Sequence, residues 1–192
     1  YNTAELRTQL EKLGYQFTSN SDTEVLLTAY LHWGENCIEK LNGIFAFAIY
    51  DHDNKKLFVA RDRIGVKPFF YYQYNNGFIF ASEIKAMLAC PILKPQVDEE
   101  GLMDIFFIGP GRSGGKGVFK NVYELLPGEC GTYRNGVFKK RKYFKLRARP
   151  HPHNKTETIE HTRWLLKDAV TRQLVSDVPL CTFLSGGLDS SI

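Results

Sequence analysis

Ile44-Phe45-Ala46-Phe47-Ala48-Ile49-Tyr50 opens a block of short apolar and aromatic runs in the middle of the sequence. Three more runs follow at residues 57–60, 69–74 and 78–81, and turn-forming residues such as Asp-Asn and Asn-Asn-Gly lie between them. Runs of this length with such turns between them predict antiparallel β-hairpins. Residues 128–133 and 137–143, which Asn135 and Gly136 separate, predict a last hairpin.

Helical patterns lie on both sides of the first strands. They cover residues 4–13, 22–33, 83–88 and 98–106. Ser21 and Glu24 have the Ser-x-x-Glu spacing of a capping box, which predicts that the second helix begins at Asp22. The first part of the chain is therefore predicted to be an α+β domain built on antiparallel sheet.

The composition changes near Pro150. A long helical pattern covers residues 156–174, and Asn154 is placed to cap it. The apolar run 178–184 then predicts a strand, and a loop of glycine and serine follows it. This order of helix, strand and tight loop is typical of a parallel α/β domain. We predict two domains, the first at residues 1–149 and the start of the second at residues 150–192.

The last loop reads Ser185-Gly186-Gly187-Leu188-Asp189-Ser190-Ser191. Two glycines let backbone amides converge on an anion at the start of a helix, and the serine hydroxyls add donors. The carboxylate of Asp189 suits a bridging Mg²⁺ rather than the phosphate itself. Because the loop has no lysine, a kinase or GTPase is disfavoured. From spacing alone, a phosphate site and a serine-rich turn both stay open.

The formal charge of +4 comes from one segment. Residues 139–149 hold seven basic residues and no acid, whereas the rest of the chain has 18 basic and 21 acidic residues. Tyr143, Phe144 and Leu146 interrupt the charges at strand-like spacing. This pattern favours a solvated strand that runs into a linker, and the alternative is an RNA-binding stripe. We therefore expect no nucleic-acid partner.

The four cysteines are Cys37, Cys90, Cys130 and Cys181, and they form no Cys-x-x-Cys pair. This spacing disfavours a zinc site or a redox dithiol. Cys37 and Cys181 are predicted to be inert packing residues on core faces. No apolar stretch reaches the roughly 18 residues that span a bilayer, and no secretory leader opens the chain. We expect a cytoplasmic protein without a membrane partner.

Asp22 is the most informative residue of the first domain. The predicted capping box uses Ser21 and Glu24, so the carboxylate of Asp22 is left to project at the helix N-terminus. One interpretation is a surface acid that complements the helix dipole. The other is an anion that binds the ammonium group of a ligand. The residues alone favour the first.

Several motifs resemble a known family in a fixed order. They are Ser21-Asp22-Thr23-Glu24-Val25, Leu41-Asn42-Gly43-Ile44-Phe45-Ala46, Arg61-Asp62-Arg63-Ile64-Gly65-Val66-Lys67-Pro68, Ser82-Glu83-Ile84-Lys85 and Leu126-Pro127-Gly128. Together they resemble the class II glutamine amidotransferase domain. The terminal loop resembles the PP-loop of ATP pyrophosphatases. The two in this order resemble glutamine-dependent asparagine synthetases over nearly the whole chain.

The resemblance implies an Ntn-hydrolase-like αββα fold, followed by the start of an adenine nucleotide α hydrolase-like domain. It implies that glutamine hydrolysis supplies ammonia to an adenylate made from aspartate and ATP, which gives asparagine, AMP and pyrophosphate. The implied substrates are glutamine, aspartate and ATP with Mg²⁺, and a homodimer stays open. Asp22 would bind the α-amino group of glutamine. The implied ATP-binding residues are Leu184, Ser185, Gly186, Gly187, Leu188, Asp189 and Ser190, with Asp189 toward Mg²⁺.

Departures from the family pattern limit what the chain can do. The N-terminal cysteine nucleophile would lie before Tyr1, and most of the ATP site would lie after Ile192. We therefore expect a piece of a longer enzyme that holds no catalytic residue and is inactive alone. Arg61, Asp62, Gly65 and Pro68 match a family motif but are assigned to hairpin structure.

Two alternatives remain at this stage. A β-lactam synthetase-like enzyme, or one that amidates peptide or cell-wall carboxylates, would share every motif quoted above. A protein of another class would use the first domain as a non-catalytic glutamine sensor. A cysteine directly after the initiator methionine of the complete gene would favour catalysis.

Overall fold

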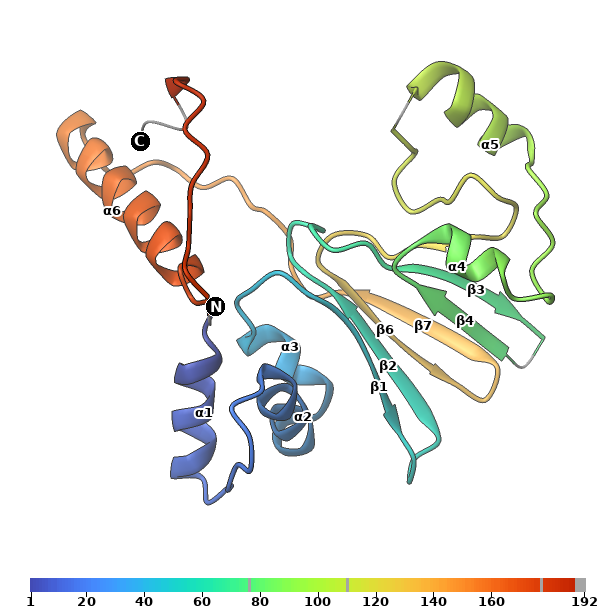
Figure 1. Ribbon diagram of the computed structural model, residues 1–192, viewed down its shortest axis with the longest axis horizontal. Helices are drawn as coiled ribbons and strands as arrows, with labels where there is room; N and C mark the ends of the chain where they lie inside the picture. Colours follow the sequence, from blue (N-terminus) through green and yellow to red (C-terminus); the bar gives the residue numbers. More distant parts are fainter. Residues whose placement is uncertain (76, 110, 177, 189–192) are drawn as a thin grey trace. The chain divides into compact units, whose positions relative to one another are not determined.

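The computed structural model describes residues 1–75, 77–109, 111–176 and 178–188 (Figure 1). The chain divides into two compact units, a larger one at Thr3–Arg147 and a smaller one at Tyr1–Asn2 with Ala148–Ile192. The helices of the larger unit are α1 (Thr3–Lys12), α2 (Asp22–Trp33), α3 (Cys37–Lys40), α4 (Ile84–Leu88) and α5 (Glu99–Met103). A 3₁₀ turn, η1 (Gly34–Asn36), and a π-helical turn, η2 (Asp104–Ile108), complete its helical segments.

Two antiparallel sheets form the centre of the larger unit. The first has the order β1-β2-β6-β7, from Ala46–Asp51, Lys56–Arg61, Glu129–Arg134 and Val137–Lys142. The second has the order β4-β3-β5, from Gly77–Ala81, Phe70–Tyr74 and Tyr123–Glu124. The three predicted hairpins are confirmed, because β1 pairs with β2, β3 with β4 and β6 with β7.

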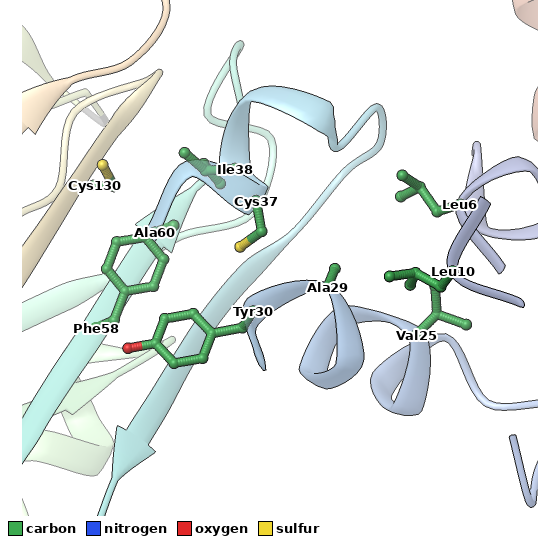
Figure 2. Close-up of a cluster of buried hydrophobic side chains, with 10 residues drawn as sticks. All are labelled: Leu6, Leu10, Val25, Ala29, Tyr30, Cys37, Ile38, Phe58, Ala60 and Cys130. Atoms are coloured by element: carbon green, nitrogen blue, oxygen red, sulfur yellow. The ribbon is translucent and has the colours of Figure 1, made fainter. Parts of the chain in front are cut away.

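Alternation along β2 divides the core into layers. Phe58 and Ala60 face α1, α2 and α3, whereas Val59 between them packs against the second sheet. Figure 2 shows the first of these layers, with the ring of Tyr30 from α2 lying beside Phe58. On the outer side of the second sheet, Met87 of α4 packs against Phe70 of β3. The order helix, sheet, sheet, helix confirms the predicted αββα architecture.

The turn between β2 and β3 is organised by the carboxylate of Asp62, which is 1% exposed. Its two oxygens accept hydrogen bonds from the backbone N–H groups of four successive residues, at 2.7 to 3.1 Å. These residues are Ile64, Gly65, Val66 and Lys67. Burial raises the pKa of the carboxyl, but the four donors outweigh it and the net pKa is lowered.

Arg61 ties this turn to the second sheet. Its guanidinium donates to the carbonyl oxygens of Gly65, Lys67 and Leu125 at 2.6 to 2.8 Å. It also forms an ion pair with Glu124 at 2.9 Å, and both side chains are nearly buried. The assignment of Arg61 and Asp62 to structure is in keeping with these contacts, since Asp62 is satisfied by the turn and Arg61 by the turn and the second sheet.

The smaller unit contains helix α6 (Lys155–Gln173). Asn154 caps it as predicted, because its side chain accepts from the backbone of Glu157 at 3.0 Å while Glu157 accepts from the backbone of Asn154 at 2.9 Å. The prediction of a strand at residues 178–184 is wrong, since these residues pair with no strand. A parallel strand needs neighbours to satisfy its backbone, and the described part of this unit offers none.

The burial of the cysteines differs between the two units. Cys37 and Cys130 are fully buried beneath the first sheet (Figure 2), and burial raises the pKa of each thiol to about 11. The packing role predicted for Cys37 is confirmed. Cys181 is exposed, so the core position predicted for it is wrong. The reason is the missing strand, because no sheet surrounds residue 181.

Candidate functional site

Asp22 is the first residue of α2 and is exposed to solvent. The helix is capped by Ser21, whose hydroxyl oxygen accepts from the backbone N–H of Thr23 at 3.1 Å. The carboxylate of Asp22 accepts from the Thr23 hydroxyl at 3.3 Å. It lies at the positive end of the helix, where an anion is stabilised. This arrangement leaves acceptor capacity for an ammonium group from solvent.

Glu24 differs from its predicted role in a capping box. Ser21 does cap the helix, but the carboxylate of Glu24 turns to the preceding loop instead of the backbone N–H of Ser21. Its Oε1 accepts from the backbone and hydroxyl of Thr18, at 2.8 and 3.0 Å. Its Oε2 accepts from the backbone and hydroxyl of Ser19, at 2.8 and 2.6 Å. The loop offers the Glu24 carboxylate four hydrogen-bond donors, whereas the helix cap offers only the backbone N–H of Ser21, so the carboxylate binds the loop.

These hydrogen bonds lower the pKa of Glu24 to about 2. The hydroxyl of Ser19 contributes most, and the backbone N–H of Thr18 comes next. A carboxylate that accepts several hydrogen bonds is stabilised in its charged form. Glu24 is therefore ionised throughout the physiological pH range.

Arg7 of α1 holds the same loop from the other side. Its guanidinium donates to the carbonyl oxygen of Ser19 at 2.8 Å and lies 4.3 Å from the centre of the Phe17 ring. The backbone N–H of Ser21 in turn donates to the hydroxyl of Ser19 at 3.2 Å. The loop that leads into Asp22 is thus fixed by side chains from both helices. Sequence reasoning missed Arg7 and the loop contacts of Glu24, because neither has a distinctive spacing.

The predicted nucleotide-binding residues belong to the smaller unit. Leu184 and Leu188 are 74% and 80% exposed. Gly186 adopts φ = +76°, a conformation that residues with a side chain rarely take, and a Cβ added there would have no atom within 4 Å. Asp189 and Ser190 lie outside the described residues. The nucleotide-binding role of residues 184–190 therefore stays a prediction, and the metal assignment to Asp189 has no structural description.

A cavity of about 290 Å³ lies elsewhere, beside α5 and η2. Asp104 lines it and fixes its rim by accepting from the backbone and hydroxyl of Ser113 at 3.0 and 2.6 Å. Phe107 also lines it, next to Phe106, and these rings are 81% and 76% exposed. Of the predicted site residues that the structure describes, Asp22 and residues 184–188, none lines this cavity. Only the apolar helical pattern at residues 98–106 points to this part of the chain, and no motif predicts a cavity there.

The described part of the chain has neither a metal-binding cluster nor a membrane-spanning helix. In residues 1–75, 77–109, 111–176 and 178–188, no group of three or more His, Cys, Asp or Glu is placed to bind a metal ion. Among the helices of these same ranges, none has the length and apolar character of a membrane span.

Comparison with known families gives two matches along the chain. A family model of the glutamine amidotransferase domain matches residues 1–144. The chain belongs to this glutamine amidotransferase family. A second model, asparagine synthase, matches residues 161–192. The predicted order of an amidotransferase domain followed by the start of an asparagine synthase region is therefore confirmed.

Curated relatives of this amidotransferase chain include "Asparagine synthetase [glutamine-hydrolyzing] 3" of Bacillus subtilis (strain 168), which is 51% identical over 191 residues. That match covers 100% of the chain and 31% of the relative. "Putative asparagine synthetase [glutamine-hydrolyzing] 2" of Methanocaldococcus jannaschii is 36% identical, and the match covers 100% of the chain and 37% of that relative. "Amidase chry2" of Gibberella zeae is 34% identical, and the match covers 92% of the chain and 26% of that relative. The chain thus spans about a third of the length of these relatives.

Solved structures agree on the fold of the amidotransferase unit. Glutamine phosphoribosylpyrophosphate amidotransferase from B. subtilis superposes with a TM-score of 0.50 at 23% identity, covering 74% of the chain and 27% of that protein. An allosteric regulatory enzyme of purine biosynthesis gives a TM-score of 0.51 at 23% identity, with 74% and 26% covered. The Ntn-hydrolase-like fold predicted for the first domain is confirmed.

Proposed function

We propose that the chain is part of a glutamine-dependent asparagine synthetase about three times its length. One observation carries the proposal: a glutamine amidotransferase region and the start of an asparagine synthase region follow each other in one chain. The whole-chain similarity to glutamine-hydrolysing asparagine synthetases supports it. The first region would release ammonia from glutamine, and the second would use it.

The reaction divides into balanced steps. Glutamine and water give glutamate and ammonia in the amidotransferase domain. The side-chain carboxylate of aspartate attacks the α-phosphate of ATP, so that an aspartyl-adenylate forms and pyrophosphate leaves. Ammonia then displaces AMP and gives asparagine. Adenylation is needed because a carboxylate oxygen is a poor leaving group, and AMP is a good one.

We assign glutamine binding in this chain to Asp22. Its carboxylate would accept hydrogen bonds from the α-ammonium group of glutamine, with the N-terminal end of α2 stabilising its charge. Exposure of Asp22, and its single hydrogen bond from Thr23, support the assignment. We assign no nucleophilic role to Cys37 or Cys130, because both thiols are buried and burial raises the pKa of each to about 11.

ATP binding is assigned to Leu184, Ser185, Gly186, Gly187, Leu188, Asp189 and Ser190. The left-handed backbone at Gly186 and the open space around it support close approach of a phosphate. Asp189 would hold Mg²⁺, which would supply positive charge to the leaving pyrophosphate. A cytoplasmic location and a homodimer stay predictions, and the four free cysteines are in keeping with a reducing compartment.

Replacing Asp22 by asparagine in the full-length enzyme is expected to raise the KM for glutamine 10- to 100-fold. A hydrogen bond between charged groups contributes about 1.5–3 kcal/mol, and about 1.4 kcal/mol corresponds to a factor of ten. Initial rates of glutamate release against glutamine concentration measure the change. Asp53→Asn is the matched control, since the side chain of Asp53 is 98% exposed. An unchanged KM in Asp22→Asn would remove Asp22 from the glutamine site.

The acceptor of the ammonia has a specific alternative. "Amidase chry2" matches 92% of the chain, so a similar sequence also occurs in a protein named for another activity. A panel of carboxylate acceptors with labelled glutamine separates the two functions. Aspartate as the preferred acceptor supports asparagine synthesis, and preference for a larger carboxylate supports the alternative.

A further inference from the structure

Hydrogen bonds, joined by the covalent bonds within Ser19, Ser21 and Thr23, connect Glu24 with Asp22. The hydroxyl of Ser19 donates to Glu24 at 2.6 Å and accepts from the backbone N–H of Ser21 at 3.2 Å. The hydroxyl of Ser21 accepts from the backbone N–H of Thr23, and the hydroxyl of Thr23 donates to Asp22. All of these groups lie within residues 18–24. A shift in the position of Glu24 would therefore move the groups that hold the carboxylate of Asp22.

We propose that Glu24 is a positioning residue that fixes the loop before α2 and so holds Asp22 in place for glutamine. The inference rests on the proposed function, because it takes Asp22 as the group that binds the ammonium. Glu24 does not touch the ligand in this account. It acts through Thr18, Ser19 and Ser21.

A carboxylate is required at residue 24 because of the donors that surround it. Four groups donate to it, namely the backbone N–H and hydroxyl of both Thr18 and Ser19. A glutamine side chain would bring one acceptor oxygen and one NH₂ group, which is itself a donor. Two of the four donors would then face another donor. The loop would have to move, and Ser21 would move with it.

The same four bonds also keep Glu24 from competing with Asp22. Two carboxylates two residues apart could both attract a ligand ammonium group. Each oxygen of Glu24 already accepts two hydrogen bonds, whereas Asp22 accepts one at 3.3 Å. The ammonium group is therefore directed to Asp22. The clamp of Arg7 on the carbonyl oxygen of Ser19 holds this arrangement from the side of α1.

A double-mutant cycle in the full-length enzyme tests the proposal. Glu24→Gln is expected to raise the KM for glutamine at least fivefold, while the kcat for glutamate release changes less than twofold. In an Asp22→Asn background, the same Glu24→Gln change is expected to alter the KM less than twofold, because its effect passes through Asp22. Pyrophosphate exchange into ATP with aspartate checks that the second active site is intact.

Two further variants complete the experiment. Glu11→Gln is the matched control, since Glu11 is an exposed glutamate on α1, and it is expected to leave the KM unchanged. Ser19→Ala removes the shortest of the four bonds and the link to Ser21, and a two- to threefold rise in KM is expected. If Glu24→Gln does not fold, as judged by circular dichroism, Ser19→Ala takes its place in the cycle.

The outcomes separate this inference from the proposed function. An equal rise in KM in both backgrounds, or no rise in the presence of Asp22, overturns the positioning role of Glu24. If Asp22→Asn itself leaves the KM unchanged, the assignment of Asp22 fails and this inference fails with it. If the KM for glutamine rises in Asp22→Asn but not in Glu24→Gln or Ser19→Ala, the assignment of Asp22 stands and only the positioning role of Glu24 is rejected.

Discussion

Replacing Asp62 by alanine is expected to lower the free energy of unfolding of the larger unit by about 3 kcal/mol. The carboxylate is 1% exposed and accepts from four successive backbone N–H groups. Its removal takes away four partly buried hydrogen bonds to a charged group, each of which contributes about 1.5–3 kcal/mol, and the loss is offset where the turn relaxes or water reaches the freed N–H groups. The turn also carries Gly65, whose carbonyl oxygen binds Arg61, so the link to the second sheet loosens as well.

Urea denaturation followed by tryptophan fluorescence measures this loss. The chain has two tryptophans, and a Trp164→Phe background leaves Trp33 of α2 as the reporter of the larger unit. Asp53→Asn again serves as a control, with a change below about 0.5 kcal/mol expected at an exposed position. A loss below about 1 kcal/mol in Asp62→Ala would contradict the account of this turn.

The same carboxyl gives the stability a pH dependence of known sign. Its pKa is lower in the folded chain than the value of about 3.9 in an unfolded chain. Its contribution is therefore fully present above about pH 4 and is lost as the pH falls through the lower folded pKa. The difference in stability between wild type and Asp62→Ala is expected to shrink below pH 4 and to stay constant between pH 5 and 8.

Replacing Phe58 by alanine is expected to cost about 4 kcal/mol. Phe58 is fully buried in the centre of β2, and its ring stacks on that of Tyr30 at 5.6 Å between ring centres. Truncation removes the largest fully buried side chain of the layer between the first sheet and its helices (Figure 2), and leaves a cavity there. The effect exceeds that at Asp62 because packed neighbours on both sides limit how far the layer can collapse.

Phe106→Ala is the matched control for Phe58, since it removes the same atoms from a ring that is 76% exposed. Its cost is expected to stay below about 0.5 kcal/mol. Urea midpoints for both variants in the Trp164→Phe background make the comparison. Similar losses at the two positions would show that the helix layer does not depend on Phe58.

The features that the sequence could predict are those set by neighbouring residues. Hairpins β1-β2 and β6-β7 follow from turn residues between apolar runs, and the cap of α6 follows from the spacing of Asn154 and Glu157. The pairing of β2 with β6 joins segments about 70 residues apart, so no local pattern indicates it. The bond from Arg61 to Leu125 could not be predicted for the same reason, because these residues lie 64 positions apart in the sequence.

The candidate site shows the same contrast. Asp22 could be singled out because the start of a helix has a sequence signature, and α2 begins there. The direction taken by Glu24 could not, since two sets of donors lay within its reach and the larger set is formed only when residues 18 and 19 fold back. At the other end of the chain, the apolar run 178–184 predicts a strand that the structure does not form. Apolar character alone does not supply the neighbouring strands that pairing needs.

Transfer of nitrogen from glutamine to asparagine tests the central claim most directly. The full-length enzyme is given glutamine labelled with ¹⁵N in the side-chain amide, together with unlabelled aspartate and ATP. If the chain is part of a glutamine-dependent asparagine synthetase, we expect ¹⁵N in the side-chain amide of asparagine, with one AMP and one pyrophosphate formed for each asparagine. Release of glutamate and labelled ammonia without label in asparagine, or formation of ADP and phosphate in place of AMP and pyrophosphate, would contradict it.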